Sequence, residues 1–145
     1  LMGTARRLKE AGQCRAIAVE PDAAALLTGG TVTGPHRIEG IGDDFIPAVV
    51  DPTLIDHVAD INDLDAIAMA AKIGRVLGLG VGISSGANFL GAVLQNREPG
   101  RQVATVFADD SKKYLTTLLA TPPAETPEMV TSRIELLGYE PVETR

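Results

Sequence analysis

The stretch that most constrains this chain is residues 77–95, LGLGVGISSGANFLGAVLQ. It contains no charged side chain, so most of it has to be buried in the folded protein. A membrane span needs about 20 apolar residues in one continuous helix. Five glycines interrupt this stretch, and the amphipathic segment before it carries Lys72 and Arg75. We therefore expect no membrane span here, but a segment buried inside a globular domain.

The pattern inside this stretch leaves two interpretations. Residues 81–83 are a short strand candidate and residues 86–94 a buried helix, joined by a tight Ser-Ser-Gly turn. In the first interpretation all of this is core, and the serines only satisfy backbone groups. In the second, the hydroxyls lie at the carboxyl edge of a parallel sheet, where open α/β folds bind ligands. No histidine is positioned by the sequence to activate either serine as a nucleophile, so a hydrogen-bonding serine is the favoured role.

The rest of the chain alternates between helix-like and strand-like segments. A helix that Asn62 or Asp63 caps and Gly78 ends is the clearest of these segments. The other expected helices cover residues 1–11, 109–119 and 128–137, the other expected strands cover 14–21, 58–61 and 102–108, and a long loop covers 29–47. Short connections between alternating strands and helices predict a layered α/β domain.

Composition excludes some classes of binding partner and indicates a cellular compartment. The formal net charge is -6, which argues against nucleic acid or an anionic membrane as a partner. The single cysteine, Cys14, excludes an internal disulfide and fits a reducing compartment, so we expect a cytoplasmic location. One cysteine and two scattered histidines, His36 and His57, form no zinc-binding pattern.

Five segments together carry a family resemblance. They are GTARRLKE, IAVEP, GGTVTGPHRIEGIGDDFIP, VGISSGAN and VATVFADDSKKYLTT, in the order and spacing of the carboxyl-terminal half of cysteine synthase. Over residues 3–118 the chain resembles the O-acetylserine sulfhydrylase group of fold-type II pyridoxal-phosphate enzymes, which is close to cystathionine β-synthase. The pairing of GPHRIEGIG…FIP with a later GISSGA is more specific than either motif alone.

The resemblance implies a fold, a cofactor and a reaction. The fold is α/β, part of the larger, mostly parallel-sheet domain of the fold-type II (tryptophan synthase β-like) enzymes, with helices on both faces. Residues 1–120 would be the carboxyl-terminal part of the cofactor-binding domain, and residues 121–145 a Pro-rich linker with a terminal helix. The reaction would be β-replacement on O-acetylserine by sulfide, through an α-aminoacrylate on pyridoxal 5′-phosphate, to give cysteine. The resemblance also implies a homodimer.

Site residues follow from the same resemblance. Ser84 would hydrogen-bond the pyridine nitrogen of the cofactor, and a neutral hydroxyl there favours β-elimination over transamination or racemisation. The backbone of Gly40, Ile41 and Gly42 would pass close to the cofactor and the amino-acid substrate. Asp110 and Ser111 would lie near the pyridine edge.

The chain departs from the family because it lacks the segment that carries the Schiff-base lysine, the substrate loop and the phosphate loop. Its four lysines, Lys9, Lys72, Lys112 and Lys113, match helix or surface positions. We therefore expect no catalytic residue in this chain, and the missing amino-terminal half as its partner.

Two other functions remain open. One is a non-catalytic dimerisation or regulatory module, for which we expect a complete sheet with no unpaired edge. The other is a related β-replacement enzyme, of the cystathionine β-synthase or diaminopropionate synthase kind. An unpaired strand edge near residues 15–20 would instead mark one part of a larger sheet.

Overall fold

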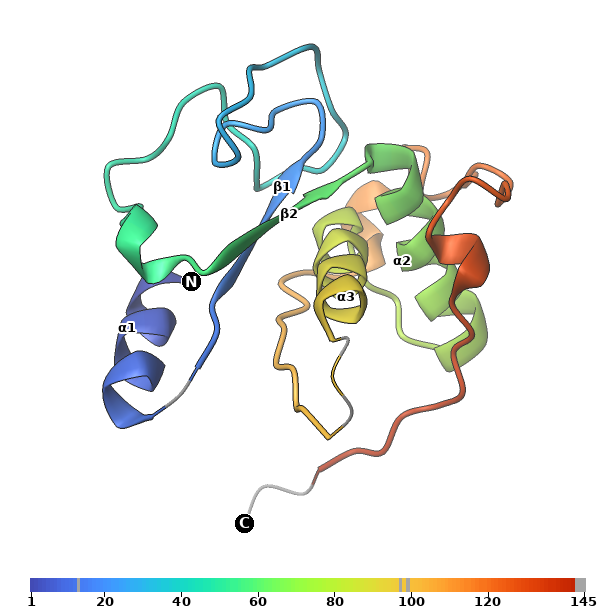
Figure 1. The fold of residues 1–145 in the computed structure, drawn as a ribbon. Coiled ribbons are helices and arrows are strands. Elements are labelled where there is room, and N and C mark those ends of the chain that lie inside the picture. Colours follow the sequence, from blue (N-terminus) through green and yellow to red (C-terminus); the bar gives the residue numbers. More distant parts are fainter. Residues whose placement is uncertain (13, 97, 99, 143–145) are drawn as a thin grey trace.

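The computed structural model describes residues 1–12, 14–96, 98 and 100–142. Its elements, with η for 3₁₀ helices, follow in the order α1 (Met2–Ala11), β1 (Ile17–Pro21), η1 (Pro52–Leu54), β2 (His57–Ile61), α2 (Asp63–Leu77), α3 (Ile83–Gln95), η2 (Ser111–Tyr114) and η3 (Thr131–Arg133). Figure 1 shows α1 and η1 together on one side of the strand pair, with α2 and α3 packed against each other on the other side. The layered α/β architecture is therefore as predicted. None of the helices in the described ranges is long and apolar enough to cross a membrane.

The two strands form a parallel pair, and one face of the pair packs against α3. The register pairs Val19 with Ala59, and α3 approaches this face so closely that a Cβ on Gly91 would lie 2.7 Å from Val19 Cγ2. On the opposite face Ala18 and Glu20 of β1 are buried, whereas Asp60 of β2 is exposed. Within the described residues the sheet has two strands, so the outer edge of β1 has no strand partner, as expected for part of a larger sheet.

Helix α2 begins and ends where the sequence predicts. The Asn62 side chain accepts hydrogen bonds from the backbone N–H groups of Leu64 and Asp65, at 3.0 and 3.4 Å, and so caps the helix. Gly78 ends the helix in the left-handed region, with φ 71°, and donates its N–H to the Gly74 carbonyl. Both caps satisfy backbone groups that a helix end otherwise leaves unpaired.

The core lies between α2, α3 and the strand pair. Its largest fully buried apolar side chains are Ile38, Ile67, Met69, Ile73 and Leu90. Small residues on the facing turns let the two helices approach closely. This packing fixes the position of the first turn of α3, where the candidate site lies.

The expected strand over residues 81–83 and the Ser-Ser-Gly turn after it are wrong. Val81 forms an isolated antiparallel bridge with Asp110, and Gly82 already caps α3, which begins at Ile83. The Gly82 N–H donates to the Asp109 carbonyl at 3.0 Å, which directs the chain away from β2 and into the helix. Ser84 and Ser85 therefore lie inside the first helical turn.

The strand expected over residues 102–108 is also not formed. These residues are extended and exposed, and they pair with no strand in the part of the chain that the structure describes. A strand is stabilised by a hydrogen-bonded neighbour, and strong local β-propensity cannot replace one.

Both helices predicted near the carboxyl end are much shorter than expected. Residues 109–119 contain only η2, and residues 128–137 contain only η3. In an α-helix the Thr131 N–H would donate to the Pro127 carbonyl, but it donates to the Asp65 carboxylate instead. The expected terminal helix is therefore wrong, whereas the division at residue 120 stays a prediction.

A pair of acidic side chains on the two strands predicts a pH-dependent stability. Asp60 is the register partner of Glu20. Partial burial raises the pKa of Asp60, and a hydrogen bond with Glu20 and the charges of Glu20 and Asp22 raise it further. The charge of His57 lowers it by a smaller amount. Because the folded state favours protonated Asp60, its contribution is fully present below the ordinary pKa of 3.8 and is lost as pH rises through the raised value.

We expect Asp60→Asn to keep the hydrogen-bonding side chain and to remove this titration. In chemical denaturation between about pH 4 and pH 8, the variant should gain stability relative to the wild type as pH rises. A stability difference that does not change with pH would contradict the assignment.

Candidate functional site

The first turn of α3 buries two serines at the positive end of the helix. Ser84 is 8% exposed and Ser85 is 0% exposed. The N-cap residue is Gly82, and no side chain makes a capping hydrogen bond to this helix. Ser84 is thus a nearly buried residue in an uncapped helical turn. The Ser85 hydroxyl is buried with no hydrogen-bond partner among the described residues.

An aspartate and a tyrosine enclose the residue that precedes this turn. A Cβ on Gly82 would overlap the Asp109 carboxylate and would lie 2.8 Å from the Tyr114 ring, so only glycine fits. Tyr114 donates its hydroxyl to Asp109 Oδ2 at 2.7 Å. Burial raises the pKa of Tyr114 to about 12, and the hydrogen bond and charge of Asp109 add to the effect, so this tyrosine stays protonated. The other oxygen, Asp109 Oδ1, is buried without a partner in the described ranges.

Asp109 is the residue that the sequence analysis missed in this region. The predicted Asp110 is exposed, and its side chain caps η2 by accepting the Lys112 N–H at 2.8 Å. The predicted Ser111 lies against Gly80, to whose carbonyl it donates its N–H. Asp109, not Asp110 or Ser111, therefore contacts the cap of α3.

The predicted loop of Gly40, Ile41 and Gly42 adopts a conformation that requires glycine. Gly40 has φ 88° and Gly42 has φ 78°, both in the left-handed region. His36 holds this loop: its Nδ1 accepts the Ile38 N–H at 3.3 Å, and its Nε2 lies 2.7 Å from the Gly42 carbonyl oxygen. Because Nδ1 is an acceptor, Nε2 carries the proton and donates to Gly42. Ile41 packs against the core.

The segment before the glycine loop and the start of α3 line one cavity. Its volume is about 530 Å³, and its lining residues are His36, Arg37, Glu39, Ile67, Ile83, Thr116, Thr117, Leu118 and Thr121. Arg37 is fixed beside it by hydrogen bonds from its N–H and its guanidinium to Asp63 Oδ2, at 3.1 and 3.3 Å. Residues next to the glycine loop and next to Ser84 therefore line one cavity, whereas Gly40, Ile41, Gly42 and Ser84 are not among its lining residues.

The family model described as "Pyridoxal-phosphate dependent enzyme" matches residues 1–109. The chain belongs to this family. A cysteine synthase of Helicobacter pylori is 43% identical over 116 residues, which cover 78% of this chain and 37% of the relative. A solved cysteine synthase of Entamoeba histolytica has a TM-score of 0.79 and 33% identity, covering 88% of this chain and 38% of that one. The family resemblance predicted from the sequence is thus confirmed.

A further solved structure in the family is an O-acetylserine dependent cystathionine β-synthase from Helicobacter pylori. It has a TM-score of 0.71 and 42% identity, and the match covers 80% of this chain and 38% of that one. The chain spans only 37% to 38% of the length of these three relatives. The parallel α/β architecture is shared with them, as predicted for part of a fold-type II enzyme.

The residues around the α3 turn fit the ring end of the cofactor that names this family. Ser84 is a partly accessible hydroxyl, and a hydroxyl can donate a hydrogen bond to a pyridine nitrogen. The buried, unpartnered Asp109 Oδ1 beside Gly82 is a second polar atom that a bound group would satisfy. The residues present are therefore compatible with a heterocycle held at this turn.

The four lysines are all engaged in ion pairs. Lys9 contacts Asp56 at 2.6 Å, Lys72 contacts Glu125 at 3.0 Å, and the exposed Lys112 and Lys113 lie 3.6 Å from Asp110 and Asp109. These contacts agree with the prediction that the lysines have helix and surface roles. The Schiff-base lysine outside this chain stays a prediction.

Proposed function

We propose that this chain forms the pyridine side of a pyridoxal 5′-phosphate site in an enzyme that replaces the β-substituent of an activated serine. The proposed substrates are O-acetylserine and sulfide, and the product is cysteine. The observation that carries the proposal is the position of Ser84, a nearly buried hydroxyl in the uncapped first turn of α3. The amino-terminal segment with the lysine, a homodimeric assembly and a cytoplasmic location belong to the same proposal.

The chemistry of this turn supports an unprotonated pyridine nitrogen. When bound, the cofactor withdraws electrons from the substrate so that its β-substituent can leave. Ser84 would offer the nitrogen a neutral hydroxyl, not a carboxylate that would hold a proton on it. The ring would then withdraw electrons only moderately, which favours loss of the β-substituent over the reactions that need a fully stabilised carbanion.

The glycine loop (Gly40, Ile41 and Gly42) would contact the ligand from the side opposite Ser84. The left-handed Gly40 and Gly42 keep side chains away from the backbone, so that a ligand can approach it closely. His36 and Arg37 anchor the loop to itself and to Asp63, which keeps the backbone in one conformation before a ligand binds. Such preorganisation lowers the cost of binding.

The adjacent serines allow a matched test of the proposed role. We expect Ser84→Ala in the intact protein to weaken pyridoxal 5′-phosphate binding by about tenfold, the usual effect of one lost hydrogen bond to a ligand. Ser85→Ala is the control, because the Ser85 hydroxyl is fully buried and makes no hydrogen bond within the described residues. The measurements are cofactor titration by absorbance and the rate of cysteine formation from O-acetylserine and sulfide. Equal values for both variants would exclude Ser84 from the site.

Ser84→Asp tests the protonation argument separately. A carboxylate at this position should favour a protonated pyridine nitrogen and shift the products toward side reactions. Product analysis at matched cofactor occupancy measures this shift. Unchanged proportions of products would contradict the argument, even if the cofactor still binds at this turn.

A second candidate activity rests on the cystathionine β-synthase relative. Its 42% identity is close to the 43% of the cysteine synthase relative, although the two values come from different alignments. We therefore include cystathionine formation from O-acetylserine as an alternative. Parallel assays with sulfide and with homocysteine distinguish the two, because the preferred nucleophile gives the larger kcat/KM.

The non-catalytic module is the remaining alternative. It calls for a complete sheet, whereas the outer edge of β1 has no strand partner in the described part of the chain. This observation favours a role as part of a larger cofactor-binding domain.

A further inference from the structure

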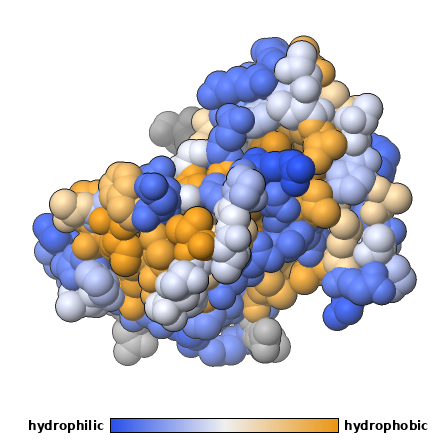
Figure 2. All heavy atoms as spheres, turned by 90° about the horizontal axis from the view of Figure 1, so that it is seen from above, coloured by the Kyte–Doolittle hydropathy of each residue, from blue (hydrophilic) through white to orange (hydrophobic). Residues whose placement is uncertain are grey.

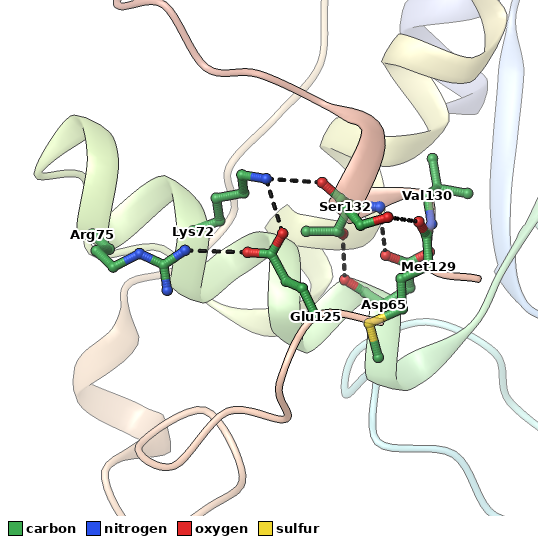
Figure 3. Close-up of polar contacts among 8 residues, drawn as sticks. Asp65, Lys72, Arg75, Glu125, Met129, Val130 and Ser132 are labelled. Carbon is green, nitrogen blue, oxygen red and sulfur yellow. Dashed lines mark hydrogen bonds and ion pairs between the residues drawn. The ribbon is translucent and has the colours of Figure 1, made fainter. Parts of the chain in front are cut away.

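A buried carboxylate in the first turn of α2 accepts hydrogen bonds from the carboxyl-terminal segment. Asp65 is 6% exposed, and its two oxygens accept the backbone N–H groups of Val130 and Thr131, at 2.7 and 2.9 Å (Figure 3). Thr131, which is fully buried, donates its hydroxyl to the Asp65 carbonyl at 3.1 Å. A buried carboxylate is tolerated only when hydrogen bonds replace its water. The segment 130–131 provides those bonds to Asp65.

A second contact lies two helical turns further along α2. Lys72 donates to Glu125 Oε2 at 3.0 Å and to the Thr131 carbonyl at 2.9 Å, and Arg75 donates to Glu125 Oε1 at 3.1 Å (Figure 3). Burial alone would raise the pKa of Glu125. The hydrogen bonds from Lys72 and Arg75 outweigh this effect and hold the pKa of Glu125 below its usual range. The segment is thus fixed to α2 at two points, which we call the α2 latch (Asp65, Lys72, Glu125 and Thr131).

The first turn of α2, which contains Asp65, contacts the backbone of the first turn of α3, which contains Ser84. A Cβ on Gly86 would overlap the Ala66 carbonyl oxygen and lie 2.9 Å from the Ala70 nitrogen. Ala66 follows Asp65 directly, and Gly86 is two residues after Ser84. Because the core is close-packed, a shift of this turn of α2 has to move the backbone that carries Ser84.

We propose that Asp65 and Thr131 are positioning residues for Ser84, acting through the contact between Ala66 and Gly86. The role of Ser84 in this proposal rests on the proposed function, whereas the coupling between α2 and α3 does not. The Thr131 side of the latch lies outside residues 1–109, the range that the family model matches. In this proposal the carboxyl-terminal segment helps to hold the site and is not only a linker.

Hydrogen exchange of the intact protein without cofactor tests the coupling directly. We expect Thr131→Val and Asp65→Asn to speed amide exchange in the α3 residues 86–90 by about tenfold, since each disrupts the buried latch. Thr131→Ser keeps the hydroxyl and should restore slow exchange. Ser132→Ala is the matched control, because that hydroxyl donates to Met129 within the segment itself.

Cofactor affinity is the second readout. Thr131→Val should weaken pyridoxal 5′-phosphate binding, whereas Thr131→Ser and Ser132→Ala should not. Faster exchange confined to residues 125–134, with α3 unchanged, would overturn the coupling. If α3 responds while Ser84→Ala leaves cofactor affinity unchanged, the coupling is supported and the proposed role of Ser84 is wrong.

Discussion

Gly86→Ala is expected to destabilise the protein by about 2 kcal/mol or more, although alanine is the better helix former. Intrinsic propensity favours alanine in a helix interior by about 1 kcal/mol. The new methyl group would overlap the Ala66 carbonyl oxygen, which is backbone and cannot rotate away. Overpacking that forces the backbone to shift costs up to about 3 kcal/mol, so the steric term outweighs the propensity. The denaturant midpoint of unfolding measures the net change.

Gly74→Ala is the matched control for this prediction. It makes the same substitution inside α2, where a Cβ would lie 3.6 Å from the Leu79 carbonyl oxygen, an ordinary contact. We expect this variant to gain up to about 1 kcal/mol from helix propensity. If the two variants changed stability by the same amount, the close contact between α2 and α3 would not be a determinant of the fold.

The sequence predicts the elements whose boundaries are set locally. Helix α2 is the clearest case, because Asn62 and Gly78 define its ends through contacts with residues no more than four positions away. The loop around Gly40 and Gly42 is a similar case, since positive φ values favour glycine whatever lies nearby.

The errors fall where distant residues decide the structure. Residues 102–108 have strong β-propensity but no strand partner in the described ranges, so they stay extended and exposed. The segment 128–137 has good helix signals, yet Asp65, more than 60 residues earlier, accepts the N–H groups of Val130 and Thr131. Local patterns contain no information about such a competitor.

The same limit applies to the site. The family resemblance predicts Ser84 and the glycine loop as site residues, and this stays a prediction, although Ile83, the neighbour of Ser84, and His36, which holds the loop, line one cavity. Asp109 was missed because its role depends on the absence of a side chain at Gly82, 27 positions earlier. The choice between Asp109 and its neighbour Asp110 depends on which of them faces the α3 cap, and spacing alone does not determine that.

Exposed apolar side chains gather on segments that the described chain leaves uncovered. Phe45, Ile46 and Val49 follow the glycine loop, and all three are more than one third exposed. Figure 2 shows hydrophobic surface on the face seen from above, which includes the long connection between β1 and β2. Exposed apolar surface of this kind is typical of a site that contacts another protein surface or a ligand.

Gly42→Ala is expected to have the second large effect, about 3 kcal/mol of stability together with weaker cofactor binding. The left-handed φ of 78° costs an alanine about 1 kcal/mol or more. In addition, the methyl group would overlap the Pro21 ring at the end of β1 and lie 2.9 Å from His36 Nε2. The substitution therefore pushes the loop off the strand and lengthens the hydrogen bond from His36 to the Gly42 carbonyl.

Gly40→Ala separates the two contributions. Gly40 has a φ of 88°, close to that of Gly42, but a Cβ there would meet nothing within 4 Å. We expect this variant to lose only about 1 kcal/mol of stability, the conformational cost of the left-handed φ. The difference in stability between the two variants then measures the contact of the loop with β1 and His36. If Gly40→Ala and Gly42→Ala lost the same stability, that contact would not hold the loop, because only the shared backbone strain would remain to explain both.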